Sequence, residues 1–242
     1  MKKTFKNKQR MITGKNYIGN KLSAKGNKTF TTFNPELNQE NESVFTEATT
    51  EEINEAVSLA TKAYKEYSKI SGTKKAAFLN AIADEILALD DVLIKTYCSE
   101  SGLPEGRANG ERGRTVGQLR GFANLIAAGS WVDATIDKGD ATREPQPKPD
   151  IRKLNFPIGP VVVFGASNFP LAFSTAGGDT AAALAAGCPV LVKSHPMHAG
   201  TGELIASAII KAAEKTNMPN GVFSNLNSSG IEVGQKLVSN SG

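Results

Sequence analysis

The first half of the chain repeats hydrophobic residues at steps of three and four, which is the spacing of one face of an α-helix. The first such stripe starts at Ile53 and ends near Ser68. Thr49 and Glu52 stand just before it at the spacing of a capping box, which predicts where that helix begins. Further stripes predict a second helix through 78–89, a third over 91–100 and a fourth over 105–128.

The pattern changes between residues 130 and 156, where hydrophobic and polar residues alternate. Two alternating segments, 130–136 and 150–156, are separated by a connection that contains three prolines. Alternation with period two is typical of β-strands. We therefore predict a two-stranded arm over 130–156 that projects from the body of the protein.

After Pro157 short apolar runs alternate with helix-like segments. The runs at 160–165, 189–193 and 221–226 resemble strands that are buried on both faces of a parallel sheet. Helical segments at 174–186 and 199–215 separate them, and another begins near Ser229. This order predicts an α/β fold with a doubly wound, mostly parallel sheet. Its domain would comprise residues 11–129 and 157–242, the latter being the βαβ part.

Composition and charge exclude several classes of protein. The chain has 242 residues, of which 40% are hydrophobic and 21% charged, as in ordinary globular proteins. Its net charge of +4 comes from the first ten residues, which hold five bases and no acid. They predict a disordered leader over 1–10, or a true start at Met11. The remaining 23 bases face 24 acids, so no nucleic-acid partner is expected.

Localisation follows from what the sequence does not contain. No run of 18 apolar residues suggests a membrane span, and no hydrophobic stretch follows the basic start as in a secretory signal. Two cysteines are too few for a disulfide framework. We expect a cytoplasmic protein with no membrane partner and no metal site.

Sheets of this class bind ligands where strand ends meet helix starts, so chemistry is expected in the loops 165–170, 193–199 and 227–230. Asn168 in the first loop offers a neutral amide donor that suits a developing oxyanion. The alternative is that Asn168 caps the next helix or satisfies the turn. The dinucleotide signature G-x-G-x-x-G is absent from this loop.

Several blocks of the sequence, in order and at suitable spacing, resemble the aldehyde dehydrogenase superfamily. They are NFPIGPVVV at 155–163, NFPL at 168–171, AAGCPVLVK at 185–193 and PNGVF at 219–223. Three upstream blocks are similar to one branch, the 2-oxoglutarate semialdehyde (2,5-dioxopentanoate) dehydrogenases. These are SGLP at 101–104, GERGRT at 110–115 and GQLR at 117–120.

The resemblance implies roles for particular residues. Asn168 matches the oxyanion asparagine of the family, Lys193 the lysine that binds the adenosine ribose, and Gly230 a glycine near the adenine. The stretch whose backbone lines the cofactor corresponds to Phe164, Gly165, Ala166 and Ser167.

One departure from the family bears on the cofactor. NAD-preferring members carry a glutamate where this chain has Pro196, and the loss of a carboxylate removes repulsion against a 2′-phosphate. Lys193 and Ser194 could donate to that phosphate. The sequence therefore favours NADP, with NAD possible. His195 and His198 could assist, but we interpret both as solvated loop residues.

Three arginines in the fourth predicted helix bear on the substrate: Arg112, Arg114 and Arg120. In the family this helix borders the substrate channel, and a dicarboxylic semialdehyde needs a cation for its distal carboxylate. Their spacing cannot place all three on one face, so at most two are expected to point inward. Surface salt bridges are the alternative for each.

The family reaction uses a cysteine nucleophile and a glutamate base, which belong downstream of the last block present here. Cys98 and Cys188 match neither role. We expect the chain to correspond to the amino-terminal half of an NADP-dependent aldehyde dehydrogenase, without the catalytic domain and poorly soluble alone. The intact enzyme would be a homodimer or homotetramer joined through the arm. Alternatives are a long-chain fatty aldehyde dehydrogenase, or an inactive truncated chain that binds a nucleotide or a partner.

Overall fold

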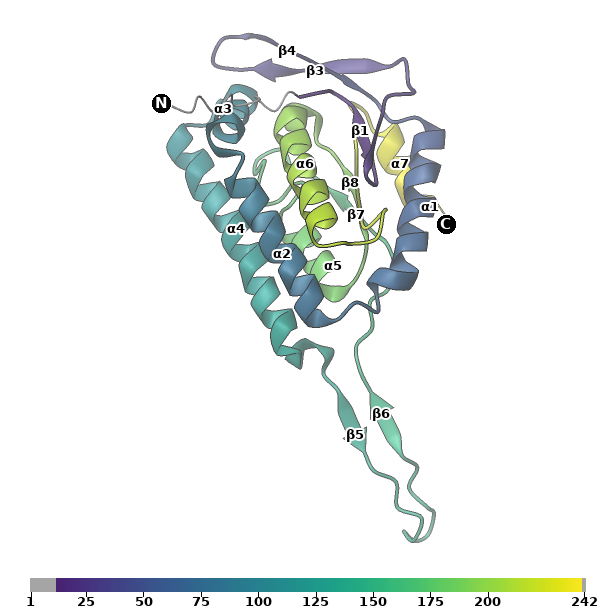
Figure 1. Cartoon of the computed structure of the whole chain (residues 1–242). Coiled ribbons are helices and arrows are strands. Elements are labelled where there is room, and N and C mark those ends of the chain that lie inside the picture. The colour runs from purple at the N-terminus through teal and green to yellow at the C-terminus, as the bar shows by residue number, and fades with distance from the viewer. Residues whose placement is uncertain (1–11, 241–242) are drawn as a thin grey trace, which may run out of the picture.

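The centre of the protein is a five-stranded sheet with strand order β2-β1-β9-β8-β7; the structure, a computed structural model, describes residues 12–240 (Figure 1). Strands β7 (Val161–Phe164), β8 (Val190–Lys193) and β9 (Phe223–Leu226) run parallel and are the three predicted apolar runs. Strands β1 (Asn16–Ile18) and β2 (Lys21–Ser23) extend the sheet in antiparallel orientation. The sheet is therefore mixed, with a parallel part that carries the predicted loops.

Helices cover both faces of this sheet, as a doubly wound fold requires. One hydrophobic core joins Val190 and Val192 of β8 to the helices α2, α4, α5 and α6, and the other joins Leu191 to α1 and α7. Successive residues of β8 therefore point to opposite cores. The bounds are α1 (Thr50–Tyr67), α2 (Gly72–Leu87), α3 (Asp90–Ser101), α4 (Glu105–Ala128), α5 (Gly178–Ala186), α6 (Ala199–Lys215) and α7 (Glu232–Val238). The predicted fold class is confirmed.

The capping box at the start of α1 is present as predicted. The Glu52 backbone N–H donates to Thr49 Oγ1 at 3.2 Å, and the Thr49 N–H donates to Glu52 Oε2 at 2.9 Å. Glu52 also accepts hydrogen bonds from Ser23 and Lys25, so the cap ties α1 to the end of β2. The start of the helix is fixed by side chains that satisfy its free N–H groups.

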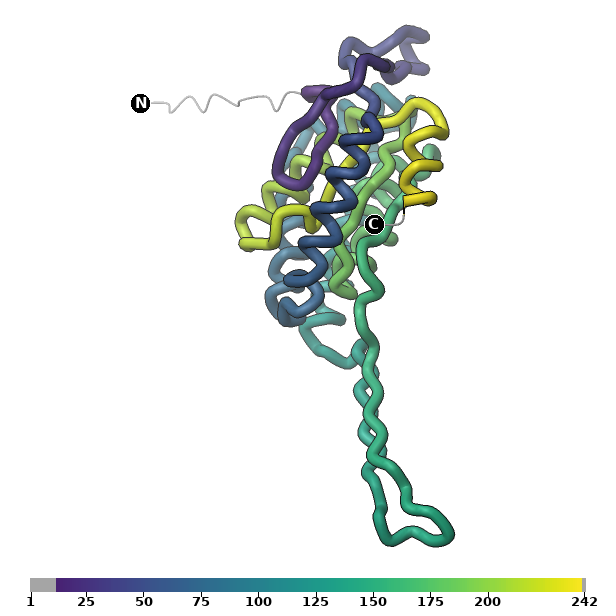
Figure 2. The backbone as a smooth tube through the Cα atoms, turned by 90° about the vertical axis from the view of Figure 1, so that its right-hand side faces the viewer, coloured from purple at the N-terminus to yellow at the C-terminus, as the bar shows by residue number. Residues whose placement is uncertain are grey.

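The arm projects far from the body, as Figures 1 and 2 both show. Its paired strands are shorter than predicted, β5 (Thr135–Asp137) and β6 (Ile151–Lys153), because Ser130–Val132 forms a 3₁₀ turn instead. Trp131 in that turn packs against the main core, with the Lys75 ammonium 5.7 Å from the centre of its ring. Anchoring this side chain prevents the strand from starting at residue 130.

Two other differences concern the segments around the sheet. Helix α5 begins at Gly178, four residues later than predicted, because residues 171–177 form turns held by contacts described below. A separate hairpin, β3 (Thr29–Asn34) and β4 (Gln39–Thr46), lies over one end of the sheet (Figure 1).

The predicted leader, residues 1–10, lies outside the described residues. Among helices in the described part, none has the length and apolar character needed to cross a membrane.

Candidate functional site

The carboxyl ends of the three parallel strands lie side by side. Phe164 pairs with Lys193, and Lys193 pairs with Leu226, so the loops that follow β7, β8 and β9 start at the same edge of the sheet. The structure thus brings together the three loops in which the sequence predicted chemistry. Phe164 itself is half-exposed, and its ring lies against Gly234 of α7.

The loop after β7 approaches its neighbours closely. The Gly165 N–H donates to Lys193 O at 3.2 Å, and a Cβ added to Gly165 would lie 2.7 Å from Ser174 Oγ. The Ala166 N–H donates to Phe173 O, which folds the loop back on itself. Ser167 and Asn168 lie on its exposed outer part. A side chain at position 165 would require the Ser174 hydroxyl to shift, so the glycine allows the loop to lie close to Ser174 and His195.

Asn168 does not cap the next helix, because the N-cap of α5 is Gly177. Within residues 12–240 the Asn168 side chain makes no hydrogen bond, so its amide is available at the exposed edge. An available amide in this position is compatible with the predicted oxyanion role, which stays a prediction.

A buried carboxylate, Glu111 of α4, holds this loop from beneath. Its Oε1 accepts the backbone N–H groups of Leu171 at 2.7 Å and Ala172 at 2.9 Å, and its Oε2 accepts the Tyr97 hydroxyl at 2.7 Å. These bonds hold the backbone at Leu171 and Ala172, and they fix the loop that carries Asn168. The turns that follow are closed by the Gly177 N–H to Ser174 O and by the Gly178 N–H to Ala172 O.

His198 is buried, so its prediction as a solvated loop residue is wrong. Its side chain is 1% exposed, and its Nε2 lies 2.8 Å from the carbonyl oxygen of Ala166. Because a carbonyl can only accept, Nε2 carries the proton. Burial lowers the pKa of His198, which keeps the ring neutral. The ring therefore supports the loop after β7 from the segment that follows β8.

His195 stacks on His198, with ring centres 5.3 Å apart, and is only partly exposed. Its Nδ1 accepts the Met197 N–H at 3.2 Å. Burial lowers the pKa of His195 to about 4, with smaller contributions from His198 and Lys193. Its interpretation as a solvated residue also fails, because the ring is held in the segment between β8 and α6.

The predicted nucleotide-binding residues differ in how accessible they are. Lys193 and Pro196 are partly exposed at the edge, whereas Ser194 is 1% exposed and its hydroxyl faces Gly202 of α6. Burial lowers the pKa of Lys193, and the nearby Glu47 carboxylate opposes that shift. Ser194 as placed here cannot donate to a ligand at the surface, because its side chain points into the interior.

The sequence did not single out Glu47, which lies between Lys193 and the loop that contains Gly230. Its carboxylate accepts the backbone N–H of Ser229 at 2.9 Å and the Ser229 hydroxyl, and lies 3.2 Å from the Lys28 ammonium. Burial raises the pKa of Glu47, but these donors more than offset it and the net shift is downward. Gly230 is partly exposed. Lys28 also lies 3.8 Å from the Glu232 carboxylate, so one ammonium is shared by two carboxylates in this part of the edge.

The three predicted substrate arginines point in different directions. Arg114 faces the loop after β7, with its guanidinium 5.0 Å from the centre of the Phe173 ring. Arg120 instead forms an ion pair with Asp84 of α2 at 3.0 Å, and Arg112 donates to Asn109 at 2.8 Å. The alternative of a salt bridge therefore describes Arg120, whereas Arg112 donates hydrogen bonds to Asn109 and to the Asp90 carbonyl. Of the three, only Arg114 faces this loop, which agrees with the expectation that at most two would point inward.

Sequence reasoning missed Arg107, which lies one turn before Glu111 on the same helix. Its guanidinium carbon is 4.6 Å from the centre of the Phe169 ring, and its Nε is 3.5 Å from Glu111 Oε2. The spacing of 107, 111 and 114 is i, i+4 and i+7, which places them on one helical face. The same spacing is visible in the sequence and would have placed Arg107 on the helical face that contains Arg114.

The two cysteines lie away from these loops. Cys188 is buried before β8, at the opposite end of that strand from Lys193, and Cys98 belongs to α3. Burial raises the pKa of the Cys98 thiol, which disfavours the reactive thiolate.

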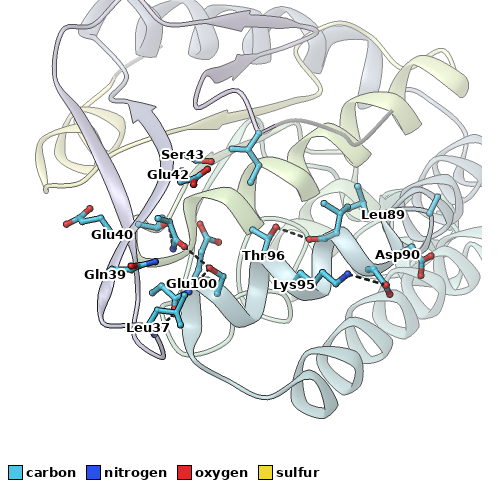
Figure 3. Close-up of a pocket in the computed structure, with 18 residues that line it drawn as sticks. Leu37, Gln39, Glu40, Glu42, Ser43, Leu89, Asp90, Lys95, Thr96 and Glu100 are labelled. Atoms are coloured by element: carbon cyan, nitrogen blue, oxygen red, sulfur yellow. Dashed lines mark hydrogen bonds and ion pairs between the residues drawn. The ribbon is translucent and has the colours of Figure 1, made fainter. Parts of the chain in front are cut away.

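A cavity of about 940 Å³ lies elsewhere, between the β3–β4 hairpin and α3 (Figure 3). It is lined by five carboxylates and one ammonium, that of Lys95, and by none of the predicted site residues. Glu100 at its inner side is buried and accepts the N–H groups of Gly200 and Thr201 at the start of α6. Burial raises the pKa of Glu100 to about 7, although those donors act in the opposite direction.

The protein is a doubly wound α/β domain whose strand ends present close-approach backbone, an available amide and a half-buried lysine, and open α/β sheets bind ligands at such edges. The chain belongs to the aldehyde dehydrogenase family, whose sequence model matches residues 22–242.

Within the family, the chain is similar to two relatives that carry the same enzyme name. The chain is 49% identical over 229 residues to "Alpha-ketoglutaric semialdehyde dehydrogenase 2" of Azospirillum brasilense, covering 94% of this chain and 44% of the relative. It is 43% identical to "Alpha-ketoglutaric semialdehyde dehydrogenase" of Acinetobacter baylyi, covering 93% of this chain and 42% of the relative.

Solved structures share the fold. An E. coli protein described as an NADP dependent enzyme superposes with a TM-score of 0.83 at 21% identity, over 97% of this chain and 46% of the other. The chain thus spans less than half the length of these relatives.

Proposed function

We propose that the protein oxidises an aldehyde to a carboxylate with NADP as the electron acceptor, and that its aldehyde is 2-oxoglutarate semialdehyde. The observation that carries the proposal is the 49% and 43% identity to two relatives named for alpha-ketoglutaric semialdehyde, since alpha-ketoglutarate and 2-oxoglutarate are the same acid. Because this chain spans less than half the length of those relatives, the proposed activity is that of the whole cellular protein to which these 242 residues belong.

The residues at the strand edge fit a nucleotide. Gly165 lets the backbone lie close to Ser174 and His195, and Lys193 is a half-buried cation near the Glu47 carboxylate. NADP would accept a hydride from the substrate. Phe164 to Ser167, Lys193, Pro196 and Gly230 would hold the nucleotide at the edge. Asn168 would donate a hydrogen bond to the aldehyde oxygen as negative charge develops on it.

The cofactor preference rests on charge near Lys193. Pro196 brings no carboxylate to the edge, and the Glu47 carboxylate is held by the Ser229 donors and by Lys28 at 3.2 Å, which also pairs with Glu232. A 2′-phosphate at Lys193 would therefore meet no carboxylate at the position that Pro196 occupies. Ser194 is left out of this proposal because its side chain is buried.

The substrate proposal rests on Arg114. It is exposed, it stacks on Phe173, and no carboxylate of the described residues pairs with it. An arginine held in this way can bind a carboxylate through two parallel N–H donors. A dicarboxylic semialdehyde carries its carboxylate at the end of the chain opposite the aldehyde, so it matches an exposed amide with a cation nearby.

We further propose that the arm joins subunits into a dimer or tetramer. Ile136 is 65% exposed, Phe156 73% and Ile158 89%, so apolar surface is presented along the arm and at its base. Exposed apolar residues that cluster on a projecting element are typical of an interaction surface.

The test uses the protein isolated from its own cells with an antibody against residues 51–90. We expect it to reduce NADP in the presence of 2-oxoglutarate semialdehyde, with kcat/KM higher for NADP than for NAD. Asn168→Ala should lower kcat by about 100- to 1000-fold, as for other oxyanion donors. Comparable kcat/KM for both nucleotides would refute the cofactor preference. Preference for long-chain aldehydes would favour the fatty aldehyde hypothesis, and nucleotide binding without turnover would contradict the proposed activity.

A further inference from the structure

The single 3₁₀ turn between β8 and α6, Pro196–His198, has an outer and an inner side. Pro196 is partly exposed at the edge of the sheet, whereas the His198 side chain is 1% exposed. The His198 N–H donates to His195 O at 3.3 Å, and the two imidazole rings stack, so the turn is held in one shape. A nucleotide at the edge would meet the outer side of this turn, while the His198 ring occupies the inner side.

The His198 ring joins this turn to the loop after β7. Its Nε2–H donates to Ala166 O at 2.8 Å, and Ala166 precedes Asn168 by two residues, a span of at most about 7 Å. At the strand ends the Gly165 N–H donates to Lys193 O at 3.2 Å. The two loops are therefore joined by a backbone bond where they leave the sheet and by a buried side-chain bond further along.

The far end of the loop after β7 is held by a different element. Glu111 of α4 accepts the N–H groups of Leu171 and Ala172, which are both buried. Between the two held points lie only residues 167–170, and the last of these is a proline, whose φ is fixed. Asn168 therefore has little freedom when both ends are held. Since α4 is not part of the strand edge, its position relative to that edge depends on the contact with the turn after β8.

We propose that His198 is a positioning residue, which fixes the distance between the nucleotide at the strand edge and the amide of Asn168. The inference rests on the proposed function and adds to it the group that links its two halves. The carbon that loses the hydride also carries the oxygen that Asn168 would hold, so an error in the distance between the two loops misplaces one group relative to the other. His198 acts through Ala166 and touches neither the substrate nor the nucleotide.

The first test is kinetic and uses the protein as isolated from cells that express each variant, with 2-oxoglutarate semialdehyde and NADP. His198→Met removes the donor and should lower kcat by about 10- to 100-fold, because a displacement of about 1 Å costs about this much at an oriented site. KM for NADP should change by less than about threefold, since the ring is buried beneath the edge. His198→Gln should restore kcat to within about threefold, because its amide can donate from near the Nε2 position.

The matched control is Tyr67→Phe, which removes a buried hydrogen bond of the same length to a backbone carbonyl, that of Leu184, outside these loops. It should change kcat by less than about twofold. An equal loss of kcat in Tyr67→Phe would show that His198 contributes only to general stability. That result, or an unchanged kcat in His198→Met, overturns the inference.

Hydrogen exchange of single backbone amides separates the inference from the proposed function. In His198→Met the Ala166 amide should exchange at least about tenfold faster, whereas those of Leu171 and Ala172 should change by less than about twofold, because Glu111 still holds them. Adenosine 2′-monophosphate, which has no nicotinamide, is the probe for the edge. It should slow exchange at Ala166 by at least about threefold in the wild type but not in His198→Met.

This exchange pattern would support the inference even if the wild type oxidised no aldehyde, in which case the proposed function alone fails. Equal acceleration at Ala166, Leu171 and Ala172 would mean that the ring stabilises the whole region without linking the two loops. That outcome, or no effect of adenosine 2′-monophosphate on the wild type, would overturn the inference.

Discussion

Two fully buried tyrosines each donate one hydrogen bond, but their acceptors differ in charge. Tyr97 donates to the Glu111 carboxylate at 2.7 Å and Tyr67 to the Leu184 carbonyl at 2.8 Å. A hydrogen bond to a charged group contributes about 1.5–3 kcal/mol and one between neutral groups about 0.5–1.5 kcal/mol. The Leu184 carbonyl also keeps the Gly187 N–H, at 3.1 Å, when the tyrosine is replaced. We therefore expect Tyr97→Phe to lower the free energy of unfolding by about 2 kcal/mol, and Tyr67→Phe by about 0.7 kcal/mol.

The assay is urea unfolding of both variants at pH 7. Burial raises the pKa of both tyrosines, so both hydroxyls remain donors at this pH. With a slope of about 2.5 kcal/mol per molar urea, the midpoints should fall by about 0.8 M and about 0.3 M, respectively. Equal shifts, or a larger shift for Tyr67→Phe, would refute the conclusion that the Glu111 side chain is the stronger acceptor of the two.

Three other outcomes test different parts of the molecule. Gly165→Ala should lower the free energy of unfolding by about 1–3 kcal/mol, because its Cβ would lie 2.7 Å from Ser174 Oγ, and Ser174→Ala should recover part of that loss in a double-mutant cycle. Burial lowers the pKa of His195 to about 4, so its contribution to stability is complete above about pH 6.5 and is lost as the pH falls. Because solvent screens a ring that is only partly buried, the wild type should lose about 1 kcal/mol more than His195→Gln between pH 7 and pH 5 in urea unfolding, and identical pH slopes would contradict this. Replacing arm residues 134–154 by a Gly-Ser linker should reduce the mass measured by light scattering to that of one subunit, whereas an unchanged mass would exclude the arm as the interface.

The elements that the sequence predicted best are those whose signals are local. Helices α4 and α6 have the predicted bounds, because the hydrophobic spacing that predicts each helix is a property of its own residues and of those next to it. The capping box at Thr49 is likewise a contact between residues three apart. The three parallel strands were found because each is a short apolar run between helical segments.

The features that sequence analysis missed depend on contacts between distant residues. The backbone before α5 is held at Leu171 by Glu111, sixty residues earlier. His198 is buried because its ring meets Ala166, 32 residues away. No local pattern reveals either contact. Arg107 is a different case, because its i, i+4 and i+7 spacing with Glu111 and Arg114 was visible and only the partner loop was unknown.

Strand β1 lies inside the sheet, between β2 and β9, although it belongs to the start of the described chain. Tyr17 pairs with Asn225, and the Gly19 N–H donates to Ser224 Oγ across 205 residues. Contacts this distant in sequence form slowly, because a long loop must close before they contribute. During synthesis β1 must therefore wait until β9 has left the ribosome, while α1 to α4 form from local contacts. A chaperone that shields the β1–β2 hairpin would be expected to act late, near the emergence of residue 226.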